Sequence, residues 1–163
     1  MKIKKVLSVV KNNVEISLFQ AGGRTVISCS AAAYDISPFP YIESTEELAK
    51  VLGIDKPEDY VFKLHDHMLP LMEEKPDVQA EVCFTEVRSG NLDLSVFFDD
   101  NKAYMVNSKY LKPFDDEDMY YIKKNSENAY IMVGGLSING VVMPIKPAET
   151  MIGDLDRIVR GVK

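Results

Sequence analysis

The sequence predicts an α+β protein with a mainly antiparallel sheet, two central helices and a C-terminal helix. Three observations support this fold class. Residues 1–40 and 78–146 consist largely of β-branched and aromatic runs separated by short turns. Residues 41–77 carry helix-capping signals, and residues 147–163 carry an apolar stripe at helical spacing. A chain of 163 residues has the length of one domain, so we expect 1–163 to be a single domain.

Residues 1–40 read as a strand meander. We expect strands at Ile3–Val10, Val14–Gln20 and Thr25–Ala31, because each run is rich in β-branched residues. Lys11–Asn13 is a plausible turn between the first two strands, and Gly22-Gly23 supplies a tight turn before the third. The basic start lacks a convincing cleavage site after its short apolar run, so we interpret it as a strand and not as a signal peptide.

Residues 41–77 should form the two central helices. The first begins at Ser44, since Glu47 stands three residues later in a capping-box spacing, and Gly53 can end it. The second begins near Pro57 and should end or kink at Pro70. Its expected apolar stripe has helical spacing and consists of Tyr60, Val61, Leu64, Met68 and Leu71.

Residues 78–146 should return to strands. The expected strands are Val78–Arg88, Leu92–Phe98, Ala103–Val106, Met119–Lys123, Ala129–Val133 and Ile138–Ile145, with a short helix at Asn107–Lys112. Asn139-Gly140 suggests a tight turn. The final helix over 147–163 has its apolar stripe at Met151, Leu155, Ile158 and Val162. This stripe must be covered by the parent sheet or by a second copy of the chain, which would make a homo-oligomer.

Charge and cysteine usage limit the function classes. The net charge is −6, and residues 41–118 hold eight basic and nineteen acidic residues. Nucleic acid is therefore expected to approach only a basic face built from the two ends of the chain. The acidic middle also fits a decoy or immunity-type protein that binds a basic partner. Cys29 and Cys83 lie in apolar runs and are expected to be free thiols in a cytoplasmic protein. No stretch is long enough to predict a membrane span.

The chemical motifs are sparse, and we expect no catalytic residue, no metal site and no cofactor. His65-Asp66-His67 is the histidine cluster of the chain. On a helix the two imidazoles point to different sides, whereas on an extended backbone they could share a metal, although zinc would want a third ligand. Asp115–Asp118 lacks the spacing of a calcium loop. A small enzyme that uses His65 and His67 remains an alternative function.

Two short motifs near the end of the strand-rich part resemble a known family. They are Asn107-Ser108-Lys109-Tyr110-Leu111 and Val141-Val142-Met143-Pro144-Ile145-Lys146. In wording and spacing they resemble the C-terminal domain of bacterial DNA polymerase sliding clamps, the β subunit, over about a third of the chain. The resemblance implies a strand, a helix and three strands in that order. It also implies an apolar groove, beside Val141, Met143 and Pro144, in which short peptide motifs of partner proteins dock.

The resulting hypothesis is a non-enzymatic protein-binding module of a bacterium, phage or mobile element. It would bind another protein, or a short peptide motif, through a sheet edge or an apolar groove. The clamp-like version of this hypothesis adds a link to DNA replication. The candidate partner-binding residues are Val141, Met143 and Pro144.

Overall fold

The computed structural model describes residues 1–99, 102–126 and 128–146, with the side chains of residues 84–86 left out. It confirms an α+β fold with a mostly antiparallel sheet and two α-helices in the described part of the chain. The predicted C-terminal helix over 147–163 lies outside the described residues. The expectation of a single domain stays a prediction.

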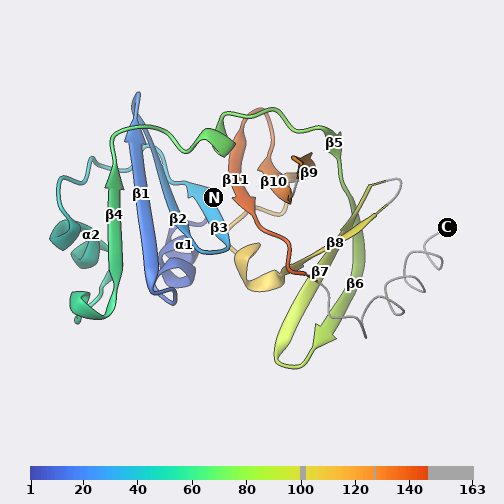
Figure 1. The fold of residues 1–163 in the computed structure, drawn as a ribbon, viewed down its shortest axis with the longest axis horizontal. Helices are drawn as coiled ribbons and strands as arrows, with labels where there is room; N and C mark the ends of the chain where they lie inside the picture. Colours follow the sequence, from blue (N-terminus) through green and yellow to red (C-terminus); the bar gives the residue numbers. More distant parts are fainter. Residues whose placement is uncertain (100–101, 127, 147–163) are drawn as a thin grey trace.

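Two sheets organise the described residues (Figure 1). The large sheet has eight strands in the order β4-β1-β2-β3-β11-β10-β9-β5, and the small sheet has three in the order β6-β7-β8. The strands of the large sheet are β1 (Glu15–Ala21), β2 (Arg24–Cys29), β3 (Ala32–Asp35), β4 (Val61–His65), β5 (Val78–Gln79), β9 (Met119–Lys124), β10 (Ala129–Gly134) and β11 (Ile138–Val142). Those of the small sheet are β6 (Glu81–Ser89), β7 (Leu92–Phe98) and β8 (Ala103–Asn107).

The N-terminal run is a helix and not the predicted strand. Helix α1 (Ile3–Val10) buries Val6 and Val10, four residues apart, and exposes the lysines of its first turn. This spacing gives a helical apolar face that the β-branched composition of the run obscures. The side-chain amides of Asn12 and Asn13 donate to the carbonyls of Ser8 and Val9, at 2.8 and 2.9 Å. The expected hairpin turn is therefore the C-terminal cap of a helix.

The first central helix is confirmed with both of its caps. Helix α2 (Thr45–Leu52) begins after Ser44, whose hydroxyl accepts the Glu47 N–H at 3.1 Å. Gly53 ends it in the left-handed region at φ 65°. The N–H groups of Gly53 and Ile54 both bond to the carbonyl of Ala49, the latter at 2.9 Å, which closes the last turn.

The second central helix was predicted wrongly, because the region holds strand β4. The 3₁₀ turn η1 (Pro57–Asp59) precedes this strand, and the 3₁₀ turn η2 (Pro70–Met72) follows it. β4 pairs in parallel with β1, starting from the Val61 N–H donated to the Val14 carbonyl at 2.8 Å. The same apolar residues fit a helix and a strand, since short apolar runs are ambiguous in period. Pairing with β1 decided in favour of the strand.

Most of the later strands follow the prediction, with two differences. The run Val78–Arg88 divides at Ala80 between β5 of the large sheet and β6 of the small sheet. The predicted short helix is the 3₁₀ turn η3 (Ser108–Tyr110), in which the Asn107 side chain accepts the Lys109 N–H. The strand, helix and three strands that the family resemblance implies are not one unit here, because η3 is a single 3₁₀ turn and β8 belongs to the small sheet whereas β9, β10 and β11 belong to the large one.

Asn139-Gly140 is not a turn, which corrects the sequence prediction. Gly140 lies inside β11, opposite Tyr34 of β3. A Cβ at position 140 would lie 2.5 Å from Cζ of Phe114 and 2.6 Å from the carbonyl oxygen of Ala33. Glycine is needed there because a ring and a neighbouring strand approach the backbone closely.

The two faces of the large sheet are covered differently. The face that we call the inner face packs against buried residues of α1 and α2 and against Phe97, Tyr104 and Val106 of the small sheet. The opposite face, here the outer face, carries a second apolar cluster. Its members outside the strands come from one segment and are Met68, Leu69, Leu71 and Met72.

Candidate functional site

The outer face of β9, β10 and β11 carries apolar side chains that remain partly open. Met119 and Met143 are each 41% exposed, and Tyr121 and Tyr130 are half-buried. We call these four residues the outer patch. Strand alternation puts Tyr121 and Tyr130 on the face of Met132, with Tyr121 directly opposite Met132 across β9 and β10. β11 ends at Val142, which pairs with Ile131, so Met143 follows the strand at the level of Tyr130.

A short segment forms one wall of this surface. Turn η2 packs against β11, and Met68 and Met72 are buried with Met132 and Val141. Leu69 and Leu71 are half-buried beside them. The centre of the outer face is therefore covered, while the outer patch extends beyond this cover.

The three predicted partner-binding residues lie at different depths. Val141 is buried, with 3% of its surface exposed, and belongs to the floor beneath η2. Met143 is exposed, and its backbone N–H donates to the Ala31 carbonyl at 2.8 Å. Pro144 is half-buried. The structure thus brings Met143 into the outer patch but keeps Val141 below the surface, and peptide binding by these residues stays a prediction.

Sequence reasoning missed Met119, Tyr121 and Tyr130. A signal for Tyr130 exists in the run Ala129–Val133, which is apolar at every position. Such a run indicates a strand with both faces buried or paired, since a solvent-facing strand alternates with polar residues. The face that Tyr121 and Tyr130 share becomes visible only from the register of β9 and β10.

Acidic side chains border the outer patch. The Lys123 ammonium lies 3.2 Å from Asp77 and 3.7 Å from Glu74, which follow η2 in the chain. A hydrogen bond from the Lys124 backbone N–H, at 2.7 Å, and a second from the Lys123 side chain lower the pKa of the Asp77 carboxyl. Glu73 and Glu74 are exposed in the same stretch. Lys75 of the same stretch is also exposed, so three carboxylates at this border stand against two cations, Lys75 and Lys123.

The two histidines lie together at the other end of the outer face. His65 stacks on Phe19, its partner in the β1–β4 register, with ring centroids 4.3 Å apart and planes 10° apart. The ring of His67 is 5.2 Å from that of His65. No acid–base or nucleophilic group of the described residues is hydrogen-bonded to either ring, and His67 has an ion-pair distance of 3.6 Å to Asp66 alone. The enzyme alternative therefore gains no catalytic geometry.

The acidic run Asp115–Asp118 is tied into the fold. The N-terminal ammonium of Met1 pairs with Asp115, which lowers the pKa of that carboxyl. Asp118 accepts the Asp115 N–H at 2.9 Å and the Asn139 side-chain amide at 3.0 Å. In the part of the chain that the structure describes, no group of three or more His, Cys, Asp or Glu side chains is placed to hold a metal ion.

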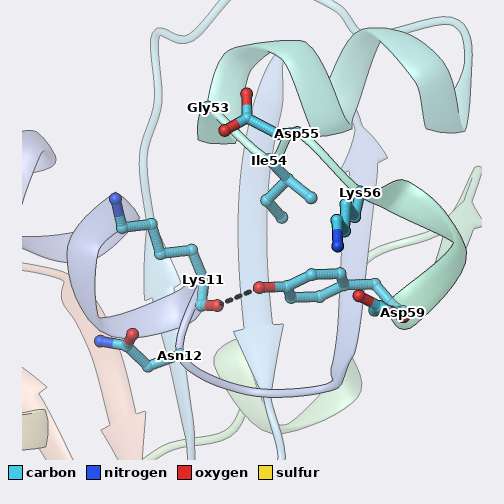
Figure 2. A pocket seen from close by; sticks show the side chains of 8 residues that line it. Lys11, Asn12, Gly53, Ile54, Asp55, Lys56 and Asp59 are labelled. Atoms are coloured by element: carbon cyan, nitrogen blue, oxygen red, sulfur yellow. Dashed lines mark hydrogen bonds between the residues drawn. The ribbon is translucent and has the colours of Figure 1, made fainter.

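A polar depression of about 280 Å³ lies where α1, α2 and η1 end (Figure 2). Lys11, Lys56, Asp55 and Asp59 line it together with Tyr60, so its charges have both signs. The Tyr60 hydroxyl donates to the Lys11 carbonyl at 2.9 Å, as the dashed line in Figure 2 marks. This hydrogen bond joins two elements of the fold, and the lining offers neither a nucleophile beside a base nor an apolar floor for a ligand.

The cysteines are free thiols, as predicted. Cys83 is buried in the small sheet, and Cys29 is half-buried in β2. Burial raises the pKa of the Cys29 thiol, which disfavours the reactive thiolate. The charge of Lys109 acts in the opposite direction on Cys29 but is outweighed by burial.

Comparisons with known proteins leave the family open. None of the family models, curated proteins or solved structures searched matches the chain. The resemblance to sliding clamps therefore stays a prediction, and the function has to be inferred from the geometry of the outer face.

Proposed function

We propose that this protein is a non-enzymatic protein-binding module that holds a short apolar segment of another polypeptide on the outer patch. The observation that carries the proposal is the partial exposure of Met119 and Met143 beside two half-buried tyrosines on one sheet face. The solvent-facing side of an antiparallel sheet usually carries polar side chains. Apolar and aromatic side chains in such a position mark an interaction surface.

The residue types suit recognition of a peptide. Methionine adapts its flexible side chain to different apolar partners. Tyrosine adds a large ring that can pack on the ligand and a hydroxyl that can hydrogen-bond at the edge of the contact. Both residue types are enriched in the centres of protein interfaces. The Tyr121 hydroxyl already lies 3.6 Å from the sulfur of Met119, so these two side chains form one continuous surface.

The expected occupant is an apolar segment flanked by basic residues. Glu73, Glu74 and Asp77 outnumber Lys75 and Lys123 at the border of the patch, and the chain carries a net charge of −6. Opposite charges on the ligand would speed its encounter with this border and fix its orientation. The clamp-like version, in which the partner belongs to the DNA replication machinery of a bacterium or phage, extends this proposal, as does a cytoplasmic location. None of the helices in the described part of the chain has the length and apolarity that a bilayer-spanning segment needs.

Fluorescence anisotropy with a labelled peptide tests the proposal. The probe is an eight-residue peptide that alternates leucine with serine and ends in lysines at both sides. We expect saturable binding that Met143→Ser weakens by about tenfold, since truncation of a well-buried interface side chain costs about 1–2 kcal/mol. The matched control is Val14→Ser, because Val14 is also exposed but precedes β1, at the far side of the large sheet. Equal affinities for the two variants would contradict the proposed site.

A further inference from the structure

The two histidines supply a second feature of the outer face, which the protein-binding proposal does not use. His65 and His67 are the only histidines in the sequence, and both belong to the short stretch at the end of β4. Their ring centroids lie 5.2 Å apart, with an angle of 67° between the planes. The helix predicted for this region would have separated them. Instead, β4 ends at His65 and the chain bends at Asp66 and His67, which leaves the two rings next to each other.

We propose that His65 and His67 form a two-imidazole chelate for a divalent transition metal, such as Cu²⁺ or Zn²⁺. Imidazole nitrogen is a preferred ligand of both metals. Two imidazoles on one tetrahedral zinc have ring centroids roughly 5 Å apart, because each Zn–N bond measures about 2.0–2.1 Å. The observed centroid separation of 5.2 Å matches that of such a ligand pair, and binding would require the rings to turn their nitrogens towards one metal.

Both rings contact Phe19, since His65 stacks on its face and His67 meets it edge-on with ring centroids 5.9 Å apart, and His67 is the more exposed of the two. Phe19, which is buried, stacks on the face of His65, so the ring edge with its two nitrogens stays available. His67 is 62% exposed and can rotate its ring towards the metal. Its Nδ1 lies 3.6 Å from a carboxylate oxygen of Asp66. This distance is too long for a hydrogen bond, so Asp66 does not decide which nitrogen of His67 binds the metal.

The site has two protein ligands in the described residues, which separates it from a structural zinc site. No third His, Cys, Asp or Glu of the described ranges completes a group with them. The remaining coordination positions would be filled by water or by a donor atom of a bound molecule. Such an open site is of the exchangeable kind and does not contribute to folding in the way that a four-ligand zinc site does.

An NMR titration with Zn²⁺ in a non-coordinating buffer tests the inference. The chain has two histidines, so the spectrum contains two sets of imidazole signals, and both proposed ligands can be followed. We expect both sets to shift along one titration curve with a stoichiometry of one metal per chain. Cu²⁺ should bind more tightly than Zn²⁺, following the general order of divalent metals. Mg²⁺ should leave both signals unchanged, because it prefers oxygen ligands.

Variants separate chelation from binding to a single exposed ring. His67→Gln and His65→Gln should each weaken Zn²⁺ binding by at least about tenfold, since even outer-shell partners of a metal are worth about 10–100-fold in affinity. Asp116→Asn, in the exposed acidic run, is the control and should retain the wild-type affinity. His67 is exposed, so its variant should fold even if loss of the His65–Phe19 stack destabilises the other.

Three outcomes would overturn the chelate. The imidazole signals could stay unchanged at millimolar Zn²⁺, they could shift with separate midpoints, or either histidine variant could bind as tightly as the wild type. None of these outcomes bears on peptide binding, because the outer patch contains neither histidine. If His67→Gln retains peptide binding, the metal site and the peptide site are independent of each other.

Discussion

The inner and outer faces of the large sheet both carry apolar side chains, but these side chains are covered to different extents. On the inner face, two capped helices and the small sheet bury the apolar residues of the strands. On the outer face, the non-strand members of the apolar cluster come from one short segment, and Met119 and Met143 remain 41% exposed. Residues of similar hydrophobicity therefore have different roles on the two faces. Those inside hold the fold together, and those outside are available for a partner.

Substitutions at two adjacent residues of β10 test this difference most strongly. Ile131 is fully buried on the inner face, whereas Tyr130 is half-buried on the outer face. Ile131→Ala should lower the free energy of unfolding by about 2–5 kcal/mol, through lost burial and the cavity that remains. Tyr130→Ser should cost less than Ile131→Ala. Urea unfolding measures both values, and a larger loss for Tyr130→Ser would contradict the division of tasks.

Gly140→Ala tests how tightly β11 is packed on the inner side. The new methyl group would lie 2.6 Å from the Ala33 carbonyl oxygen and within 2.5 Å of the Phe114 ring. The backbone of β3 cannot move away as a flexible side chain can, so we expect a loss of about 1–3 kcal/mol. Gly135→Ala is the matched control, because a Cβ there meets nothing within 4 Å. Thermal unfolding should show a clear decrease for the first variant alone.

Ser44→Ala weakens one of the helices that cover the inner face. The Ser44 hydroxyl accepts the Glu47 N–H at the start of α2, and its loss should cost about 1 kcal/mol. Ser8→Ala in α1 provides the control, since Ser8 is exposed and alanine favours a helix. Chemical denaturation measures both, and an unchanged midpoint for Ser44→Ala would show that this cap is not needed.

Acid should loosen the cover of the outer face. The pKa of Asp77 is lower in the folded protein than its ordinary value of about 3.9, owing to hydrogen bonds from Lys124 and Lys123. Its contribution to stability is therefore complete above about pH 4 and is lost as the pH falls through the folded value. Unfolding curves measured between neutral pH and about pH 2 should show a weaker acid dependence for Asp77→Asn than for the wild type. An identical acid dependence would exclude Asp77 as an anchor.

The smallest stability effect is expected at the proposed site itself. Met143→Ser should change the free energy of unfolding by less than about 0.5 kcal/mol, as is usual for exposed positions. The same variant should lose most of the peptide affinity. A large destabilisation would instead place Met143 among the residues that hold the fold.

Local signals in the sequence were sufficient for much of the fold. The caps of α2 and the strand β7 lie where Ser44, Gly53 and the run Leu92–Phe98 predicted them. The errors at α1 and β4 have one cause, because short apolar runs fit both periods and tertiary pairing decides between them. Of the candidate site, Met143 could be predicted, whereas Tyr121 and Tyr130 depend on strand register. Register is a long-range property that the sequence does not display.

The central claim, that the outer patch binds an apolar segment, is tested most directly by methionine methyl NMR during a titration with the leucine–serine–lysine peptide. The account predicts saturable shifts of the Met143 and Met119 methyl signals and a constant signal from Met105, which is buried in the small sheet. Saturable peptide binding with unchanged signals from Met119 and Met143, or no binding at millimolar peptide, would contradict it.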